Sequence, residues 1–254
     1  MTGKWAAALA LCLVALGVSG VALVGRDAPV GGSAAVPMAV DTAGPARPRL
    51  ALLTSLPLLF GEKFALDSPP TAAALRLDAA YALSPIAVTD VASLRGHRLL
   101  LMAHPRAQPA EMLVALDRWV RAGGRVVLLA DPRLDWHSER PFGDPLRPPP
   151  DFADTGLLAH WGLSLEGPVV DGPQSRHAAG LEVLTASPGS LAATNDSCAV
   201  SAGGLLAECR VGRGVAMVVA DADFLNVSGE GALDGPTSQN LDLLMRVLSR
   251  GRNR

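Results

Sequence analysis

Short apolar runs closed by polar residues or proline recur along the chain from residue 49 onward, and they predict buried strands. A compact run of this kind, bounded by turn residues, is typical of a strand covered on both faces. The four clearest runs are Arg49–Pro57, Leu99–Ala103, Arg125–Ala130 and Gly214–Ala220.

Between two of these runs the apolar spacing changes to that of a helix. Gln108–Ala122 places Met112, Leu116 and Val120 on one face, and Gly123-Gly124 supplies a helix end. A strand, a helix, a glycine turn and a second strand in close succession indicate a βαβ unit with a parallel strand pair. Further helices are predicted at Thr71–Ala82, Leu157–Trp161 and Thr237–Leu248.

The expected fold class is therefore α/β, with a mostly parallel sheet flanked by helices and with an added β-hairpin. The hairpin signal is Gly203-Gly204 between two short apolar segments. A two-residue turn there places Cys198 directly opposite Cys209, within reach of a disulfide bond. A bridge is expected if the domain is exported to an oxidising compartment, and two reduced thiols are the alternative.

The amino terminus predicts a membrane segment. Trp5–Val24 is uncharged, and a helix of that length covers the roughly 30 Å hydrocarbon core of a bilayer. Residues 1–26 are thus expected to be a transmembrane anchor, 27–48 a linker rich in Gly, Ala and Pro, and 49–254 an exported domain. The predicted location is the inner membrane, single-pass, with the domain on the periplasmic side; a cleaved signal peptide is the alternative.

Composition narrows the function classes further. The chain has 22 basic and 24 acidic residues and a net charge of -2, which does not indicate a nucleic-acid surface. Lys4 and Lys63 are the only lysines, so phosphate loops built around lysine are also not indicated. The sequence lacks the G-x-S-x-G, H-E-x-x-H, C-x-x-C and Walker patterns, and its histidines lack metal-ligand spacing. No cofactor and no metal are therefore predicted.

Polar residues that directly follow buried strands are the remaining candidates, because ligands of open parallel sheets bind at the carboxyl ends of the strands. One reading is a hydrolase or a metal-assisted enzyme that uses His104, Asp131 and Asp221, with nearby arginines binding an anion. The other reading is that these side chains cap strand ends and bind turn amides. The full candidate set for ligand binding is His104, Arg106, Asp131, Arg133, Asp221 and Asp223.

One stretch resembles a known family. The segment LLLMAHPRAQPAEMLVALDRWVRAGGRVVLLADP is similar to the central βαβ unit of the auxiliary-protein family of ABC-type transport systems, the gliding-motility type. LLAHWGLSL and GRGVAMVVADADFLN resemble its later elements, so that the resemblance covers roughly 49–250. It implies an α/β fold like that of class I glutamine amidotransferases (similar to the flavodoxin-like arrangement) without the amidotransferase nucleophile.

The resemblance implies a non-catalytic, membrane-anchored accessory domain of an ABC-type transport system that acts by protein or ligand binding. The expected partners are ABC transporter permease or ATPase subunits, and no nucleic acid. The alternatives are the enzyme built on the strand-end residues and a structural cell-envelope protein.

Overall fold

The computed structural model describes residues 47–61, 69–228, 231–233, 235, 237 and 239–250. The chain divides into two units, Met1–Gly44 and Pro45–Arg254. The first unit lies outside the described residues, so the account below concerns the second.

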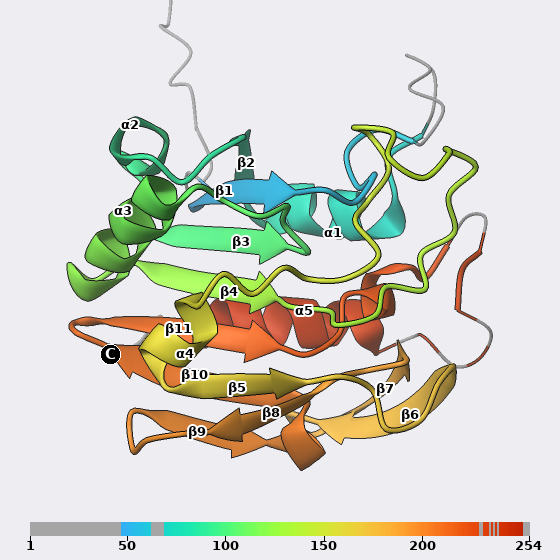
Figure 1. Cartoon of the computed structure of the whole chain (residues 1–254). Coiled ribbons are helices and arrows are strands. Elements are labelled where there is room, and N and C mark those ends of the chain that lie inside the picture. Colours follow the sequence, from blue (N-terminus) through green and yellow to red (C-terminus); the bar gives the residue numbers. More distant parts are fainter. Residues whose placement is uncertain are drawn as a thin grey trace, which may run out of the picture. The chain divides into compact units, whose positions relative to one another are not determined.

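A seven-stranded sheet forms the centre of this unit, in the order β2-β1-β3-β4-β11-β10-β9 (Figure 1). Neighbouring strands from β2 to β11 pair in parallel, whereas β10 pairs antiparallel with both β11 and β9. The strands of this sheet are β1 (Arg49–Thr54), β2 (Ala82–Pro85), β3 (Leu99–Ala103), β4 (Arg125–Leu129), β9 (Cys198–Ser201), β10 (Leu206–Val211) and β11 (Gly214–Val219).

Two smaller antiparallel sheets accompany the main sheet. One pairs β5 (Leu163–Glu166) with β8 (Ser190–Ala193), and the other pairs β6 (Pro173–Ala178) with β7 (Leu181–Ala186). Strand β8 contacts β9 and β10, which links the first small sheet to the main one.

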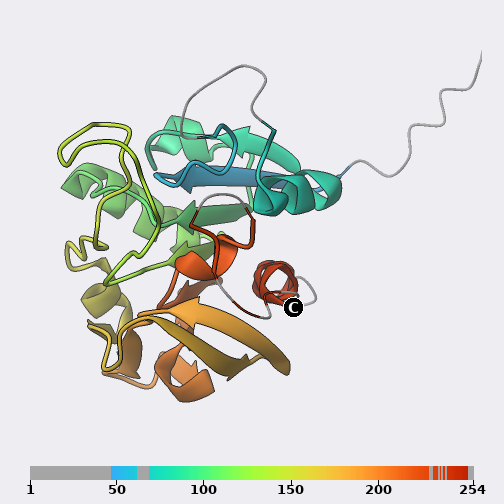
Figure 2. The same ribbon diagram turned by 90° about the vertical axis from the view of Figure 1, so that its right-hand side faces the viewer.

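Helices cover both faces of the main sheet. Figures 1 and 2 show α1 (Ala72–Ala80) and α5 (Asn240–Ser249) on one face, and α3 (Ala110–Arg121) and α4 (Leu157–Trp161) on the other. A short α2 (Val91–Leu94) packs against α3. Because strand side chains alternate between faces, the core is divided into two clusters.

Each cluster takes alternate residues of the same strands. On the α5 face, Leu101 and Leu129 pack with Leu244 of α5, and all three are fully buried. On the α3 face, the intervening residues Leu100 and Leu128 are buried in the second cluster. The continuous apolar runs seen in the sequence are thus strands that face a core on both sides.

The turn after α3 requires glycine for two different reasons. Gly123 has a φ of 111°, in the left-handed region that side chains disfavour. Gly124 lies against the indole of Trp119, and a Cβ there would meet the ring at 2.5 Å. This turn directs the chain from α3 back into β4.

The β9–β10 hairpin holds Cys198 and Cys209 opposite each other. Cys198 pairs with Cys209 in the strand register, and the two form a disulfide bond. The connection contains a 3-10 turn, η1 (Ala202–Gly204), in which Gly203 and Gly204 both have positive φ. A second 3-10 turn, η2 (Asp223–Leu225), follows β11.

The fold class expected from the sequence needs correction. The sheet is mixed, and two separate antiparallel pairs accompany it, so a mostly parallel amidotransferase- or flavodoxin-like sheet was the wrong prediction. The reason is visible in β6, which reads PQSRHA and has only one fully buried residue, Ala178. Such polar strands give no apolar run and were not anticipated.

The membrane prediction is corrected as well. Among the described residues, no helix has the length and apolar character needed to cross a bilayer. Trp5–Val24, on which the anchor was predicted, lies outside the described residues, as does the linker up to residue 46. The transmembrane helix and the single-pass, inner-membrane, periplasmic location are therefore not carried forward.

Candidate functional site

Three aspartates meet at the carboxyl edge of the main sheet because of the strand register. Leu129 of β4 pairs with Val219 of β11, and Asp131 and Asp221 each follow two residues later. Asp223 follows Asp221 by two residues and is the first residue of η2. A carboxylate oxygen of each residue lies within 4.8 Å of the others, and no side chain is more than 2% exposed.

His104 does not join this cluster. His104 directly follows β3 with a left-handed φ of 46°, and the group of ligand atoms that lie within 4.8 Å of one another contains the three aspartates and not His104. Its Nε2 lies 2.9 Å from the carbonyl oxygen of Pro149, and its Nδ1 has no hydrogen-bond partner. Burial lowers the pKa of His104, which favours the neutral imidazole.

Backbone N–H groups already occupy the aspartate carboxylates. A buried carboxylate needs hydrogen bonds, and here the backbone N–H groups that follow the strands supply them, so each aspartate acts as a cap at a strand end. Asp131 accepts from Arg133 at 2.9 Å and Ala222 at 2.7 Å, Asp221 accepts from Phe224 at 2.8 Å and Ala186 at 3.1 Å, and Asp223 accepts from Asp135 at 2.8 Å.

Burial and mutual repulsion change the ionisation of the cluster. Loss of hydration is the main cause that raises the pKa of Asp131 to about 6 and that of Asp223 to about 8. The same cause, reinforced by the charges of its two neighbours, raises the pKa of Asp221 well above its usual range. The cluster therefore retains protons that an exposed aspartate releases.

Among the described residues, these three aspartates are the group that brings enough carboxylates together for a metal ion. Their oxygens, however, accept backbone hydrogen bonds, and neither of the two cavities described below is lined by them. Within the described part of the chain, the hydrogen bonds named above for these three carboxylates all come from backbone N–H groups, and none comes from a nucleophilic side chain as in a catalytic pair. We interpret the cluster as a cap that joins the ends of β4 and β11.

The two arginines predicted beside the aspartates are engaged with the protein itself. Arg106 donates to the carbonyl oxygen of Pro145 at 2.6 Å and also to that of Arg147. Arg133 forms an ion pair with Asp171 at 2.6 Å. Both side chains hold loops at the carboxyl edge, so the structure brings Asp131, Asp221 and Asp223 together but not the predicted anion site.

The opposite, amino edge of the sheet carries a row of arginines. Arg49 and Arg125 are the first residues of β1 and β4, and Arg98 and Arg213 immediately precede β3 and β11. On β10, Arg210 pairs with Val215, the same residue that pairs with Arg125 on its other side. We call Arg49, Arg98, Arg125, Arg213 and Arg210 the arginine row.

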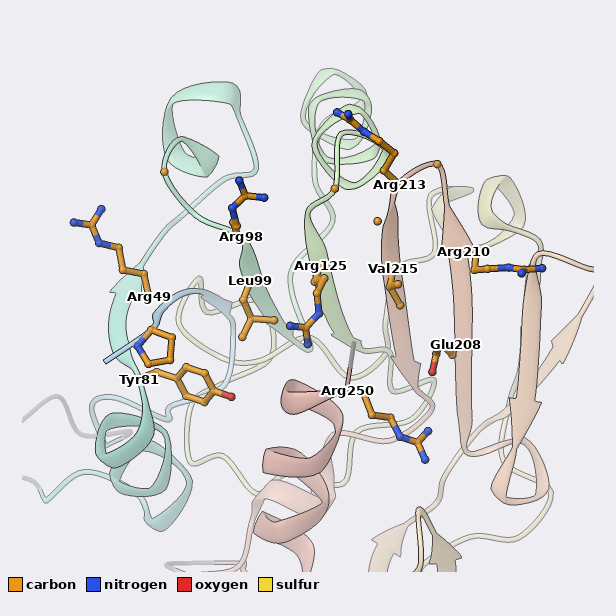
Figure 3. Close-up of a pocket in the computed structure, with 15 residues that line it drawn as sticks. Arg49, Tyr81, Arg98, Leu99, Arg125, Glu208, Arg210, Arg213, Val215 and Arg250 are labelled. Atoms are coloured by element: carbon orange, nitrogen blue, oxygen red, sulfur yellow. The ribbon is translucent and has the colours of Figure 1, made fainter. Parts of the chain in front are cut away.

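The arginine row lines a cleft of about 890 Å³. Figure 3 shows Arg125 pointing toward the end of α5, with Arg250 beside that end and Arg98 and Arg213 pointing the other way. Leu99, Val215 and Tyr81 supply apolar lining, and among the described residues Glu208 is the only acidic one that lines the cleft. The cleft thus has a strongly positive wall.

Some of these arginines have partners within the protein. Arg125 donates to the carbonyl oxygen of Leu248 at 2.7 Å, near the end of α5, and Arg213 donates to that of Ala122 at 3.1 Å, at the end of α3. These contacts suit the partial negative charge of a helix carboxyl end. No side-chain hydrogen bond or ion pair joins the remaining four to any described residue; they are Arg49, Arg98, Arg210 and Arg250.

A sequence signal for the arginine row existed and was not used. The predicted buried strands begin RLALL, RLLLM, RVVLL and RGVAM, each with arginine before the apolar run. Because the amino ends of parallel strands meet at one edge, a residue type repeated at strand starts must gather there. The predicted ligand-binding residues were taken only from the carboxyl ends of the strands, which lie at the other edge.

Comparison with known proteins supports the fold but names no function. No protein-family model matches the sequence. No curated protein is significantly similar to it. The mmIFT52 N-terminal domain is similar in structure, with a TM-score of 0.50 and 16% identity over 80% of this chain and 98% of that domain. At this identity the likeness concerns the fold alone.

Two further solved structures are similar to this chain with lower TM-scores. The cytoplasmic protein STM3548 from Salmonella typhimurium has a TM-score of 0.47 and 10% identity, over 79% of this chain and 97% of its own. A β-galactosidase from Rahnella sp. R3 has a TM-score of 0.44 and 14% identity, over 79% of this chain and 30% of its own. Neither similarity is close enough to support an inference.

Proposed function

We propose that this protein is a non-catalytic binding domain that holds a multiply charged anion in the arginine cleft. The observation that carries the proposal is the set of four guanidinium groups without a described protein partner around one hollow, where only Glu208 is acidic. A cleft of about 890 Å³ is in the range of ligand sites.

The choice of residue supports an anionic ligand. Arginine stays charged and presents a planar fork of donors that matches carboxylate and phosphate groups. The chain as a whole has a net charge of -2, so these arginines are a local concentration on an otherwise slightly acidic molecule. A concave wall of one sign raises the local concentration of ligands of the opposite sign.

The lining favours binding over catalysis. The described residues that line it are Arg, Gly, Pro, Leu, Val, Tyr and one Glu, and none of them is histidine, cysteine, serine or threonine. Nucleophilic catalysis requires a nucleophile beside a base, and this set supplies no such pair. Service beside the permease or ATPase subunits of an ABC-type transporter remains a separate prediction of the sequence resemblance.

The experiment is a calorimetric titration of the full chain with sodium tripolyphosphate in low salt. We expect saturable binding of one ligand per chain. At least one of two double variants, Arg49→Gln/Arg98→Gln and Arg210→Gln/Arg250→Gln, is expected to lose affinity by about tenfold or more.

The matched control is Arg95→Gln/Arg118→Gln, which removes the same charge from two exposed arginines that do not line the cleft. It should bind like the unmodified chain. Absence of saturable binding, or an equal loss in the control and in both cleft variants, would falsify the proposal.

A further inference from the structure

We infer that the ligand of the arginine cleft is an extended acidic segment of a protein partner, lying across the amino edge of the sheet. This inference rests on the proposed anion-binding function and specifies its ligand class. It follows from the length of the arginine row, the separation of its unpartnered side chains and the absence of a base-stacking surface.

The length of the row sets the size of the ligand. Arg49 is on β1 and Arg210 on β10, and between them the strand order is β1-β3-β4-β11-β10. With about 4.8 Å between neighbouring strands, these four steps span roughly 19 Å. An extended peptide covers that distance with about six residues at roughly 3.3 Å each. A single phosphate or citrate reaches only one end.

The unpartnered arginines lie at the two ends of the row rather than at one point. Arg49 and Arg98 belong to the β1–β3 end and Arg210 to the β10 end, while Arg250, at the end of α5, lines a second cavity together with Arg210 (Figure 3). The central arginines are used by the helix ends of α3 and α5. A ligand that satisfies both ends must carry several charges along an extended chain, as a run of Asp and Glu does.

The second cavity adjoins the cleft beyond β10, and a bound peptide can extend into it past the end of the arginine row. It has a volume of about 430 Å³, shares Glu208, Arg210 and Arg250 with the first and runs along β9. Ser197 and Ser201 line it and supply hydroxyl groups. Glycines at positions 96, 123, 212 and 214 line the first cleft, so few side chains block the approach of a peptide backbone there.

Other features disfavour a nucleic acid. Tyr81 is the only aromatic residue among the described residues of the lining, and it is 1% exposed, so this part of the chain offers no ring for base stacking. Glu208 in the first cavity and Asp196 in the second lie along the path, so a ligand that passes them needs hydrogen-bond donors in its backbone. A peptide offers N–H groups to these carboxylates, which a nucleic-acid backbone lacks.

The test is fluorescence anisotropy of the full chain with labelled deca-glutamate, tri-glutamate and a ten-nucleotide oligothymidylate, all at one salt concentration. We expect deca-glutamate to bind at least about tenfold more tightly than tri-glutamate, because only the longer peptide reaches both ends. We expect each of the double variants Arg49→Gln/Arg98→Gln and Arg210→Gln/Arg250→Gln to weaken deca-glutamate binding by about tenfold or more, and Arg95→Gln/Arg118→Gln to leave it unchanged.

The outcomes separate this inference from the proposed function. If deca-glutamate binds no better than tri-glutamate, or if only one double variant weakens it, the extended ligand is ruled out while tripolyphosphate binding still supports an anion site. Tighter binding of the oligothymidylate, lost in both double variants, would assign the row to nucleic acid and overturn the inference. If no probe binds, including tripolyphosphate, the proposed function itself fails.

Discussion

The two edges of the same sheet carry different side chains in different surroundings: buried aspartates at one edge, and arginines around an open cleft at the other. At the carboxyl edge, three aspartates are almost completely buried and accept hydrogen bonds from backbone N–H groups. At the amino edge, arginines line an open cleft, and four of them have no described side-chain partner. The sequence drew attention to the first edge, and the geometry supports the second as the ligand site.

The contrast shows that the position of a charged residue at a strand end does not by itself define a binding site. A buried charge must be satisfied by the protein, and once satisfied it contributes to folding rather than to recognition. A solvated charge in a concave wall costs the fold little and stays available to a ligand. Mutations at the carboxyl edge should therefore change the free energy of unfolding, and mutations at the amino edge should change ligand affinity.

Removing the Asp131 carboxylate is expected to have the largest effect on stability. Asp131→Ala removes the acceptor of the buried Ala222 N–H group and of the part-buried Arg133 N–H group. Each unsatisfied donor costs about 1–3 kcal/mol, so we expect the free energy of unfolding to fall by roughly 3–5 kcal/mol. Urea denaturation measures this, and a loss below about 1 kcal/mol would show that the aspartates do not act as a cap.

Removing the disulfide is expected to be the next largest change. The Cys198→Ala/Cys209→Ala double variant frees the ends of a short loop that the bond closes. Loops of this size predict a loss of about 2–4 kcal/mol in the free energy of unfolding. Urea denaturation of the unmodified chain with and without a reductant is the control, and the double variant should match the reduced protein. A double variant as stable as the oxidised chain contradicts the prediction.

The pH dependence of stability is expected to come from the carboxyl edge. The pKa of Asp131 is raised to about 6 and that of Asp223 to about 8, so the folded chain binds more protons than the unfolded chain above pH 4. The free energy of unfolding should therefore fall as the pH rises above 4. The contribution of Asp131 is lost by about pH 6 and that of Asp223 by about pH 8. The slope is about 1.4 kcal/mol per pH unit for each proton retained.

Denaturation curves between pH 4 and 8 test this slope, with Asp223→Asn as the comparison. Asparagine keeps an acceptor for the Asp135 N–H but carries no titrating group. The variant should show a flatter pH profile than the unmodified chain. An unchanged profile would mean that Asp223 does not hold its proton in the folded state.

Neutralising the amino edge is expected to have the smallest effect on stability. Arg98→Gln removes an exposed side chain without a described partner, so the free energy of unfolding should change by less than about 0.5 kcal/mol. Denaturation and tripolyphosphate titration of the same variant make the comparison direct. A loss of stability similar to that of Asp131→Ala would make the arginine row structural and remove the distinction between the edges.

The parts of the fold that sequence patterns predicted are those with strong periodicity. The strand at Leu99–Ala103 has the predicted bounds, and α3 lies within the predicted Gln108–Ala122, because continuous and helical apolar spacing are strong signals. Strand β6 (PQSRHA) is polar, and β8 (SLAA) is too short to form an apolar run, so neither carries such a signal. Their omission led to the wrong fold class.

The candidate site was predictable only in part, for a geometric reason. The proximity of Asp131 and Asp221 follows from two neighbouring strands that end in the same register. The separation of His104 was not predictable in this way, because His104 takes a left-handed φ of 46° directly after β3, where strand periodicity no longer applies. The arginine row was encoded at the strand starts, but the cleft beside it depends on where α5 ends, which the sequence pattern does not define.

The arginine row is assembled from residues that are far apart in the chain. Arg49, Arg125 and Arg210 lie on β1, β4 and β10, and Arg98 directly precedes β3, so only the complete sheet brings the four to one edge. A ligand that bridges them binds the folded chain and not its fragments, so it stabilises the whole sheet against opening. Occupancy of the cleft should therefore slow hydrogen exchange and proteolysis throughout the domain, and the partner would sense whether the protein is folded.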